Sequence, residues 1–231
     1  MRAALESLLR ERKLDVTLTA AGEIAPPERL AATGDAALDA SLGGGLRRGH
    51  LSEIAGPASS GRSSVAVTAL AAAAERGEAV ALVDACDTFD PASAAARGLA
   101  LERLLWVRPP APSSLPLGTG DADGARALKA FSLILQAGGF GLVVLDLADV
   151  PVQVLRRSPW YRTTSTWMRI ARIVEGSETV ALLIGGERIA RSAGGVTIAL
   201  EPSPGRWQGV THRARLFTGV STAPRVVRAR G

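Results

Sequence analysis

The chain has 231 residues, of which 47% are hydrophobic, and its formal net charge is +5. This length is enough for one sizeable α/β core and too short for two full domains joined by a long linker. The single cysteine, Cys86, excludes an intramolecular disulfide, and two isolated histidines, His50 and His212, offer no zinc site. The charged N-terminus is unlike a signal peptide, and no apolar run reaches the roughly 18 residues of a membrane span. We therefore expect a cytoplasmic protein that does not act in a membrane.

The N-terminal part predicts a short amphipathic helix followed by a connector. Leu5, Leu8 and Leu9 repeat at helical spacing, so this helix packs either on the domain itself or on a partner. Residues 22–34 then contain proline and glycine breaks. The predicted segments are an N-terminal helix with its connector at 1–30, a core at 31–220 and an Arg-rich C-terminal tail at 221–231.

From His50 onward, strand and helix patterns alternate regularly. A short strand precedes a glycine-rich loop, and a helix then runs from Ser63 to Gly77. The further predicted strands are 79–85, 104–107, a buried run ending at Asp146, 179–186, 197–202 and 214–219; the further helices are 91–97, 125–139 and 163–175. Residues 109–124, rich in Pro, Gly and Ser, predict an exposed loop. From Thr222 the chain is expected to be disordered or paired with a partner.

Repeated strand–helix–strand units with apolar strands predict an α/β fold: a mostly parallel, doubly wound sheet flanked by helices. Ligands of such sheets bind beyond the carboxyl ends of the strands. The loop at residues 56–64, Asp84 and Asp146 all follow predicted strands, so we expect them to converge on one edge of the sheet.

The loop at residues 56–64 reads GPASSGRSS and is nearly a phosphate-binding loop. Such loops use glycines to turn backbone N–H groups toward an anion at a helix start, a lysine to bridge the terminal phosphates and a hydroxyl to hold magnesium. Here Arg62 stands in the lysine position, where its longer, planar guanidinium fits poorly. The predicted vestigial site comprises Gly56, Ser60, Gly61, Arg62, Ser63 and Ser64, with Asp146 on the magnesium side. A cap at the strand end explains Asp146 equally well.

Charge is distributed unevenly along the chain. Residues 1–155 carry 14 basic and 18 acidic side chains, which gives −4, whereas residues 156–231 carry 13 arginines and four glutamates, which gives +9. Arginines interleaved with aromatic side chains are typical of single-stranded nucleic acid binding. The candidate DNA or partner contacts are Arg156, Arg157, Trp160, Tyr161, Arg162, Arg225, Arg228 and Arg230. A solvated surface explains such arginines as well, and the sequence leaves both interpretations open.

The stretch from Thr33 to Pro91 resembles the RecA recombinase core. It contains in order a T-G pair, an L-D pair, an L-G-G-G-L turn, a G-x-x-x-E-I strand, the glycine loop and a D-A-x-x-x-x-D-P segment. Six ordered elements over about sixty residues go beyond what a generic helix-opening turn contains. The resemblance implies a single RecA-like domain with a site for ATP and magnesium.

Several positions depart from that resemblance. Cys86 stands where RecA-type ATPases are expected to carry the glutamate that activates water, and a thiol is a poor substitute for this base. Asp87 is adjacent but is expected to point elsewhere. Gly185 and Gly186 replace a polar sensor residue, and the second DNA-binding loop shrinks to ERIARSAGG. We therefore predict no catalytic residue, a degenerate ATPase that is not an enzyme, and either no cofactor or weakly bound ATP, with Ser63 and Asp146 holding magnesium if the nucleotide binds.

A RecA-like core of this length with an altered loop and an Arg-rich C-terminal part resembles the ImuA family of bacterial mutagenic translesion synthesis. This resemblance implies an accessory adaptor of the SOS response. Its implied partners are ImuB, an error-prone replicative-type polymerase reached through ImuB, RecA and single-stranded DNA, together with self-association. Two alternatives stay open: a weak DNA-dependent RecA-type ATPase, and a SulA-like cell-division inhibitor, although SulA-like chains lack the glycine loop.

Overall fold

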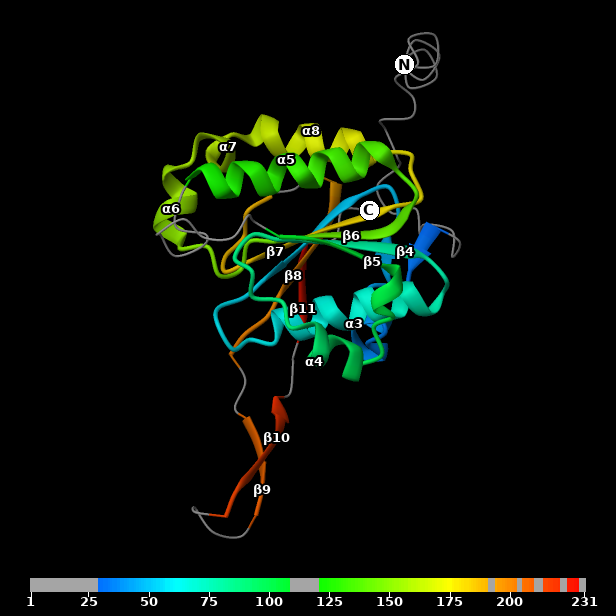
Figure 1. Cartoon of the computed structure of the whole chain (residues 1–231), viewed down its shortest axis with the longest axis vertical. Helices are drawn as coiled ribbons and strands as arrows, with labels where there is room; N and C mark the ends of the chain where they lie inside the picture. The colour runs from blue at the N-terminus through cyan, green and yellow to red at the C-terminus, as the bar shows by residue number, and fades with distance from the viewer. Residues whose placement is uncertain are drawn as a thin grey trace, which may run out of the picture.

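The computed structural model describes residues 29–108, 121–190, 194–202, 205–209, 214–220 and 224–228. The predicted N-terminal helix with Leu5, Leu8 and Leu9 lies outside these residues, as does Arg230. In the described part, a seven-stranded sheet lies between two layers of helices (Figure 1). No helix among these residues combines the length and the apolar character needed to span a bilayer.

The strands of the large sheet follow the order β11-β8-β3-β7-β6-β4-β5. They are β3 (Leu51–Ala55), β4 (Ala79–Asp84), β5 (Leu104–Val107), β6 (Phe140–Asp146), β7 (Val180–Gly185), β8 (Gly194–Ala199) and β11 (Arg225–Arg228). Neighbouring strands are parallel except for β11, which pairs antiparallel with β8. The predicted α/β fold with a mostly parallel, doubly wound sheet is therefore confirmed.

Helices cover both faces of this sheet (Figure 1). On one face lie α3 (Arg62–Glu75) and α4 (Pro91–Ala96), and on the other lie α5 (Asp121–Ala137), α6 (Val152–Arg157), α7 (Pro159–Arg162) and α8 (Thr164–Val174). The smaller elements are β1 (Leu30–Ala31), α2 (Ala36–Ser41), β2 (Leu46–Arg47), the 3-10 turn η3 (Leu101–Arg103), β9 (Gly205–Gln208) and β10 (Leu216–Val220).

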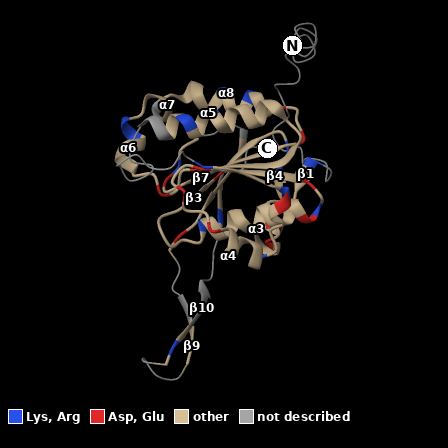
Figure 2. Ribbon diagram, in the orientation of Figure 1, with Lys and Arg blue, Asp and Glu red and all other residues tan. Residues whose placement is uncertain are grey.

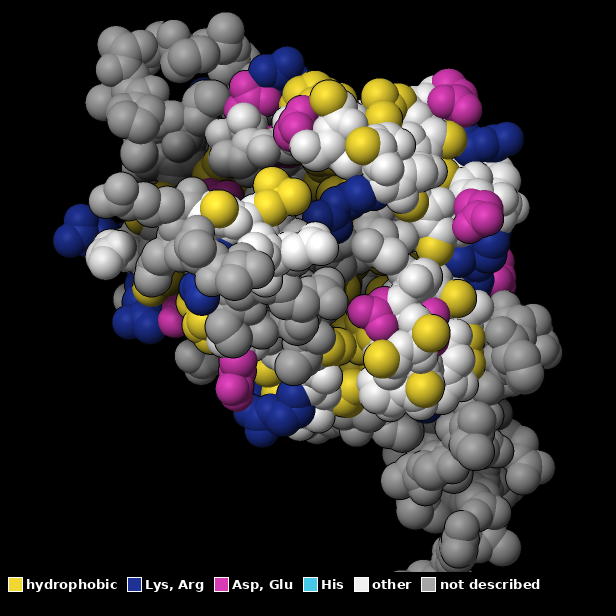
Figure 3. Space-filling model, turned by 90° about the horizontal axis from the view of Figure 1, so that it is seen from below, with side chains coloured by type: hydrophobic (Ala, Val, Ile, Leu, Met, Phe, Trp, Pro, Cys, Tyr) yellow, Lys and Arg dark blue, Asp and Glu magenta, His cyan; other side chains and the backbone are white. Residues whose placement is uncertain are grey.

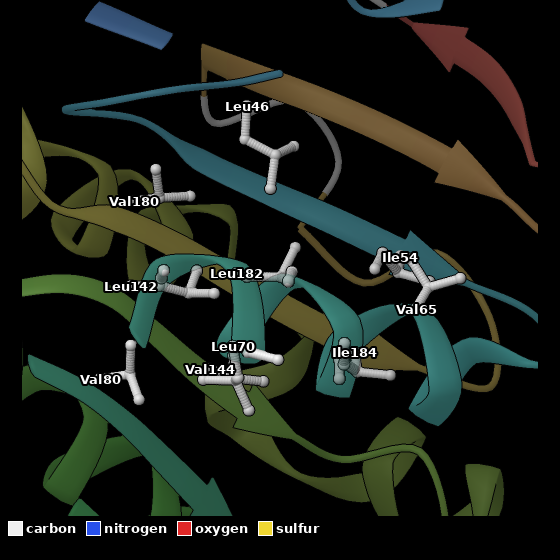
Figure 4. Packing of buried hydrophobic residues seen from close by; sticks show 14 of the residues in the cluster. Leu46, Ile54, Val65, Leu70, Val80, Leu142, Val144, Val180, Leu182 and Ile184 are labelled. Carbon is white, nitrogen blue, oxygen red and sulfur yellow. The ribbon is translucent and has the colours of Figure 1, made fainter. Parts of the chain in front are cut away.

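Alternation along the central strands divides the hydrophobic core into two. Leu142 and Val144 of β6 belong to the cluster beneath α3, whereas Val143 and Leu145 belong to the cluster beneath α5 and α8. Figure 4 shows the first cluster, in which Leu70 of α3 packs on the sheet. Because successive side chains of a strand point to opposite faces, a strand covered on both sides must be apolar throughout. This requirement explains the continuous apolar runs in the sequence.

Local capping fixes where two of the helices begin. The Asp35 carboxylate accepts the amide N–H groups of Ala37 and Leu38 at the start of α2. Asp90 accepts the amides of Ala92 and Ser93 at the start of α4. Such side-chain caps satisfy N–H groups that have no partner within the helix.

Several segments differ from the sequence prediction, and the small elements β1, α2, β2 and β9 were also not predicted. Helix α5 begins at Asp121 and so includes Gly124, which the prediction assigned to a loop. A Cβ on Gly124 would meet the Trp160 ring at 2.6 Å, so this helix position needs glycine for packing. The short helices α6 and α7 were predicted as neither helix nor strand. Residues 225–228 of the predicted tail form β11, an edge strand of the sheet, because they complete the pairing of β8.

Charged residues of the described part lie mostly in loops and at helix ends (Figure 2). Seen from the side of α3 and α4, acidic and basic side chains are interspersed with hydrophobic ones, and no single sign dominates this face (Figure 3). Among the described residues, this face therefore shows no basic patch over α3 and α4.

Candidate functional site

The glycine-rich loop connects β3 with α3, as the sequence pattern requires. Gly61 adopts a left-handed conformation with φ of 87° and precedes the first residue of α3. A Cβ on Gly56 would approach the Leu200 carbonyl oxygen to 2.9 Å, so the start of the loop also needs glycine. Ser63 is exposed in the first helical turn, and the Ser60 hydroxyl is buried without a hydrogen-bond partner among the described residues. The loop thus presents a helix N-terminus and two hydroxyls.

Arg62, the residue in the lysine position, is held by the protein itself. Its side chain is buried, and the guanidinium donates to the carbonyl oxygen of Gly56 at 2.6 Å and to that of Ala148 at 3.0 Å. It also forms an ion pair with Asp149 at 2.7 Å. These contacts tie the glycine loop to the segment that follows β6, and we call them the Arg62 clamp. The sequence prediction gave the position of this arginine but not these partners.

Asp84 and Asp146 lie side by side at the ends of adjacent strands, because β4 and β6 place them in register. The buried Asp84 carboxylate accepts amide N–H groups of Cys86, Thr88 and Phe89, so it organises the turn after β4. This use of Asp84 explains a polar residue at the end of an otherwise apolar strand. The predicted convergence of the loop, Asp84 and Asp146 at one edge of the sheet is observed.

Asp146 is an acid whose environment disfavours its charge. Burial raises its pKa from 3.8 to about 6, and the nearby Asp84 and Asp149 carboxylates add to this effect. The Ala148 amide, which donates to Asp146 at 2.9 Å, and Arg62 act in the opposite direction. The capping role that the sequence allowed for Asp146 is thus present in the structure.

A cavity of about 220 Å³ opens beside these groups, between the start of α3, helix α4 and the sheet. Its polar lining comes from Ser63, Ser64, Thr88, Asp90, Ser93, Arg97 and Asp146. Its remaining walls are largely apolar, with Val67, Leu70 and Phe89 among them. Sequence reasoning missed the contribution of α4, although the Asp90–Pro91 helix start was a usable signal.

Asp87 points away from this cavity, as expected. Its carboxylate forms an ion pair with Arg108 at 2.5 Å, and the Arg108 guanidinium lies 4.5 Å from the centre of the Trp106 ring. Cys86, half-buried in the turn, donates its amide N–H to Asp84. The Asp87 carboxylate is therefore directed toward the end of β5, whereas Asp90 lines the cavity.

The arginine and aromatic residues of α6 and α7 form a second polar cluster. Several of its polar groups already have hydrogen-bond partners within the chain. Arg156 donates two N–H groups to Glu187, at 2.7 and 3.2 Å, and the Tyr161 hydroxyl donates to the same carboxylate at 2.8 Å. Burial together with Glu187 raises the pKa of Tyr161. A cavity of about 840 Å³ lies beside them, lined also by Trp167 and Arg188.

The aromatic rings of this cluster pack within the helix layer. Trp160 is half-buried and makes edge contacts with Tyr161 and Trp167, whose ring centres lie 6.2 and 6.3 Å away. Trp167 is fully buried, and its indole N–H donates to the Tyr161 carbonyl oxygen. Their packing contributes to the core on this side of the sheet.

The structure does not bring all the predicted arginine contacts together. Arg157 is exposed on α6, and the Arg162 side chain lies outside the described part. Arg225 is exposed on β11, 3.9 Å from Glu201, and Arg228 ends the same strand. The predicted residues therefore lie in two separate regions, helices α6 and α7 in one helix layer and strand β11 at the sheet edge.

Sequence reasoning missed Glu53, a buried acid in β3. Its carboxylate accepts the amide N–H groups of Ile189 and Ala190, and burial raises its pKa. With Glu187, it fixes both ends of the short segment after β7. A single glutamate within the apolar strand LSEIA was the signal available in the sequence.

Comparison with known proteins places the chain in a family. The model of the RecA N-terminal domain matches residues 21–153, so the chain belongs to the RecA family. Protein RecA of Kineococcus radiotolerans is 33% identical over 151 residues, covering 59% of this chain and 40% of the relative. Protein RecA of Chlorobaculum tepidum is 37% identical over 115 residues, covering 49% and 30%. The chain thus spans well under half the length of these relatives.

A solved structure gives the same fold. The crystal structure of the RadB recombinase aligns with a TM-score of 0.55 and 21% identity, covering 76% of this chain and 86% of that one. The predicted RecA-like architecture is confirmed. The family match contains the glycine loop, Asp84 and Asp146, and it ends at the start of α6.

Proposed function

We propose that this protein is an accessory adaptor of SOS-induced mutagenic translesion DNA synthesis, similar to the ImuA family, and that its RecA-like core no longer hydrolyses ATP. The observation that carries the proposal is the Arg62 clamp. The basic side chain of the glycine loop is satisfied by two carbonyl oxygens and the Asp149 carboxylate. A cation bound in this way is not positioned to bridge terminal phosphates.

The residues around the loop fit a nucleotide only in part. The helix N-terminus and the exposed Ser63 suit a phosphate and its magnesium ion, and the adjoining cavity has polar groups at the same end. Cys86 supplies no carboxylate for activating water, and Gly185 and Gly186 supply no polar side chain. We therefore propose that ATP with magnesium binds weakly or not at all, and that no catalytic step depends on it.

The proposed partners are ImuB, an error-prone replicative-type polymerase through ImuB, RecA and single-stranded DNA. Arg157 supports a contact surface on α6, because it is exposed beside a cluster whose other cation, Arg156, is paired with Glu187. Surface arginines in such positions favour acidic or phosphate-bearing partners. Arg225 on the exposed edge strand β11 supports a second contact.

The loss of catalysis is tested by DNA-stimulated ATP hydrolysis with the full chain, Arg62→Lys and Asp146→Ala. We expect no turnover above the buffer rate in any of the three. Turnover in the wild-type chain that disappears in Asp146→Ala would contradict the proposal. That result would favour the alternative of a weak DNA-dependent ATPase, which the cavity between Ser63 and Asp146 supports.

The adaptor role is tested by binding to purified ImuB. We expect Arg157→Glu to weaken binding about tenfold, because it reverses an exposed charge of the proposed contact surface. The matched control is Arg172→Glu, which reverses an exposed arginine on α8 in the same helix layer. Failure of the wild-type chain to bind ImuB contradicts the proposed partner, and equal weakening by both variants contradicts the proposed surface.

A further inference from the structure

Strands β9 and β10 form a hairpin that stands away from the body of the molecule (Figure 1). Within the described residues the two strands pair only with each other, with Leu216 opposite Gln208 and Phe217 opposite Trp207. Both outer strand edges are therefore free in this part of the structure. An isolated two-stranded hairpin is marginally stable in water, so an added strand or packing surface would stabilise this one.

The hairpin is specified by the sequence. Gly209, which follows β9, has φ of 135°, a backbone conformation that favours glycine. A Cβ at this position would also collide with the Ala214 carbonyl oxygen on the returning chain. Glycine at this position therefore allows the two strands to approach each other.

Among the side chains that the structure describes, each face of the hairpin exposes a large apolar one. Trp207 is 56% exposed and Leu216 is 68% exposed. Leu216 shares a face with Gln208, its direct partner, and Trp207 is the neighbour of Gln208 in the strand, so its side chain lies on the other face. The hairpin thus offers apolar contacts on both sides of a ribbon whose edges are free to pair.

The charged residues in the C-terminal sequence around the hairpin are all arginines. From Pro202 to the end of the chain there are six arginines and no aspartate or glutamate, and Arg215 is exposed on the hairpin. Figure 2 shows a basic residue on β9 as well. A partner that neutralises this charge must be acidic.

Two kinds of acidic partner fit this charge, and the apolar side chains decide between them. Nucleic acids offer phosphates and aromatic faces, which use arginine and tryptophan but gain little from an exposed leucine. A protein segment that adds a strand to a free edge uses backbone hydrogen bonds and alternating side-chain contacts. Leu216 and the free edges therefore favour protein.

We propose that the β9–β10 hairpin docks an extended, acidic segment of a partner protein, in which acidic and apolar residues alternate. The segment pairs with a strand edge, its apolar side chains cover Trp207 or Leu216, and its carboxylates face the arginines. Binding of such a segment does not require that the glycine loop binds ATP, and it does not require that ImuB or RecA is the partner.

The test uses the full chain and a fluorescein-labelled synthetic peptide that alternates glutamate and valine, with binding followed by fluorescence anisotropy. A peptide that alternates glutamate and serine has the same charge without the apolar side chains, and an oligothymidylate of equal length is the nucleic acid probe. We expect the glutamate–valine peptide to bind about tenfold or more tightly than the other two probes.

The double variant Trp207→Ser/Leu216→Ser is expected to weaken peptide binding about tenfold or more. The matched control is Leu133→Ser/Met168→Ser, which removes side chains of similar exposure, 55% and 57%, from α5 and α8, and we expect it to bind as the wild type does. Gly209→Val alters the hairpin while keeping its apolar side chains, and it should weaken binding as well. Thermal unfolding of each variant confirms that the core is intact.

Three outcomes overturn the inference. The first is equal binding of the glutamate–valine and glutamate–serine peptides, which would show that charge alone accounts for the binding. The second is unchanged affinity in both hairpin variants. The third is tighter, hairpin-dependent binding of oligothymidylate, which identifies the hairpin as a nucleic acid interface.

Discussion

The carboxyl edge of the sheet and the β9–β10 hairpin use their charged side chains in opposite ways. At the sheet edge, Arg62 and Arg156 are both paired with carboxylates of the same chain. On the hairpin, Arg215 is exposed beside the exposed Leu216, in a stretch without acidic residues. The cations beside the glycine loop and at Glu187 are thus held by carboxylates of the chain itself, whereas we propose that the cations of the hairpin are available to a partner.

The largest predicted effect concerns the helix layer that supports Tyr161. Trp167→Ala removes a fully buried ring that packs on Trp160 and donates to the Tyr161 carbonyl oxygen. We expect the free energy of unfolding to fall by about 3–5 kcal/mol, measured by urea denaturation. The neighbouring Met168→Ala changes an exposed side chain and should stay within about 0.5 kcal/mol of the wild type. Equal losses in the two variants would show that this layer does not depend on Trp167.

The second prediction tests whether the Arg62 clamp stabilises the fold. Arg62→Ala leaves the carbonyl oxygens of Gly56 and Ala148 without this donor, so we expect a loss of about 1–3 kcal/mol in the free energy of unfolding. The control Arg157→Ala removes an exposed arginine and should cost less than about 0.5 kcal/mol. A neutral Arg62→Ala would indicate that the clamp contributes nothing to folding.

The third prediction is a dependence of stability on pH through Asp146. The folded state raises the pKa of this group from 3.8 to about 6, so the stabilisation it gives when protonated is full below about pH 4 and is lost as the pH rises through about 6. Asp146→Asn should therefore be more stable than the wild type by about 1–2 kcal/mol at pH 7.5. The advantage should vanish near pH 4. An advantage of the same size at both pH values would contradict the assignment.

The smallest predicted effect concerns the polar cluster at Glu187. Tyr161→Phe removes one hydrogen bond to Glu187 and should cost about 0.5–1 kcal/mol of unfolding free energy. Arg156→Ala should change the stability less than Arg62→Ala does, because the arginine is largely exposed and its ion pair is screened by solvent. Chemical denaturation of both variants checks this order. A loss in Arg156→Ala as large as that in Arg62→Ala would remove the contrast between the exposed pair and the buried clamp.

The central sheet could be predicted because its strands are covered on both faces. Strands β4, β6 and β7 are continuous apolar runs, and their short length separates them from the longer helices. The edge strand β11 was harder to predict from the sequence. Strand β11 is short and basic, and it forms because β8 offers it a pairing partner.

The site was predicted in its position but not in its contacts. The glycine loop, Asp84 and Asp146 each carry a local signal. Arg62 is held by Ala148 and Asp149, which lie 86 and 87 positions further along the chain. No local sequence pattern indicates such distant partners. The packing of Trp160 against Gly124 is similarly a tertiary contact that no local pattern indicates.

The central claim is that Arg62 is bound by the protein and does not serve a nucleotide. The most direct measurement follows the side-chain N–H signals of Arg62 by NMR while ATP and magnesium are added to the full chain, with Asp149→Ala as the control that releases one partner. We predict slowly exchanging signals that ATP leaves unchanged and that shift in Asp149→Ala. A shift of the wild-type signals on addition of ATP, to the same end point in both chains, would contradict the claim.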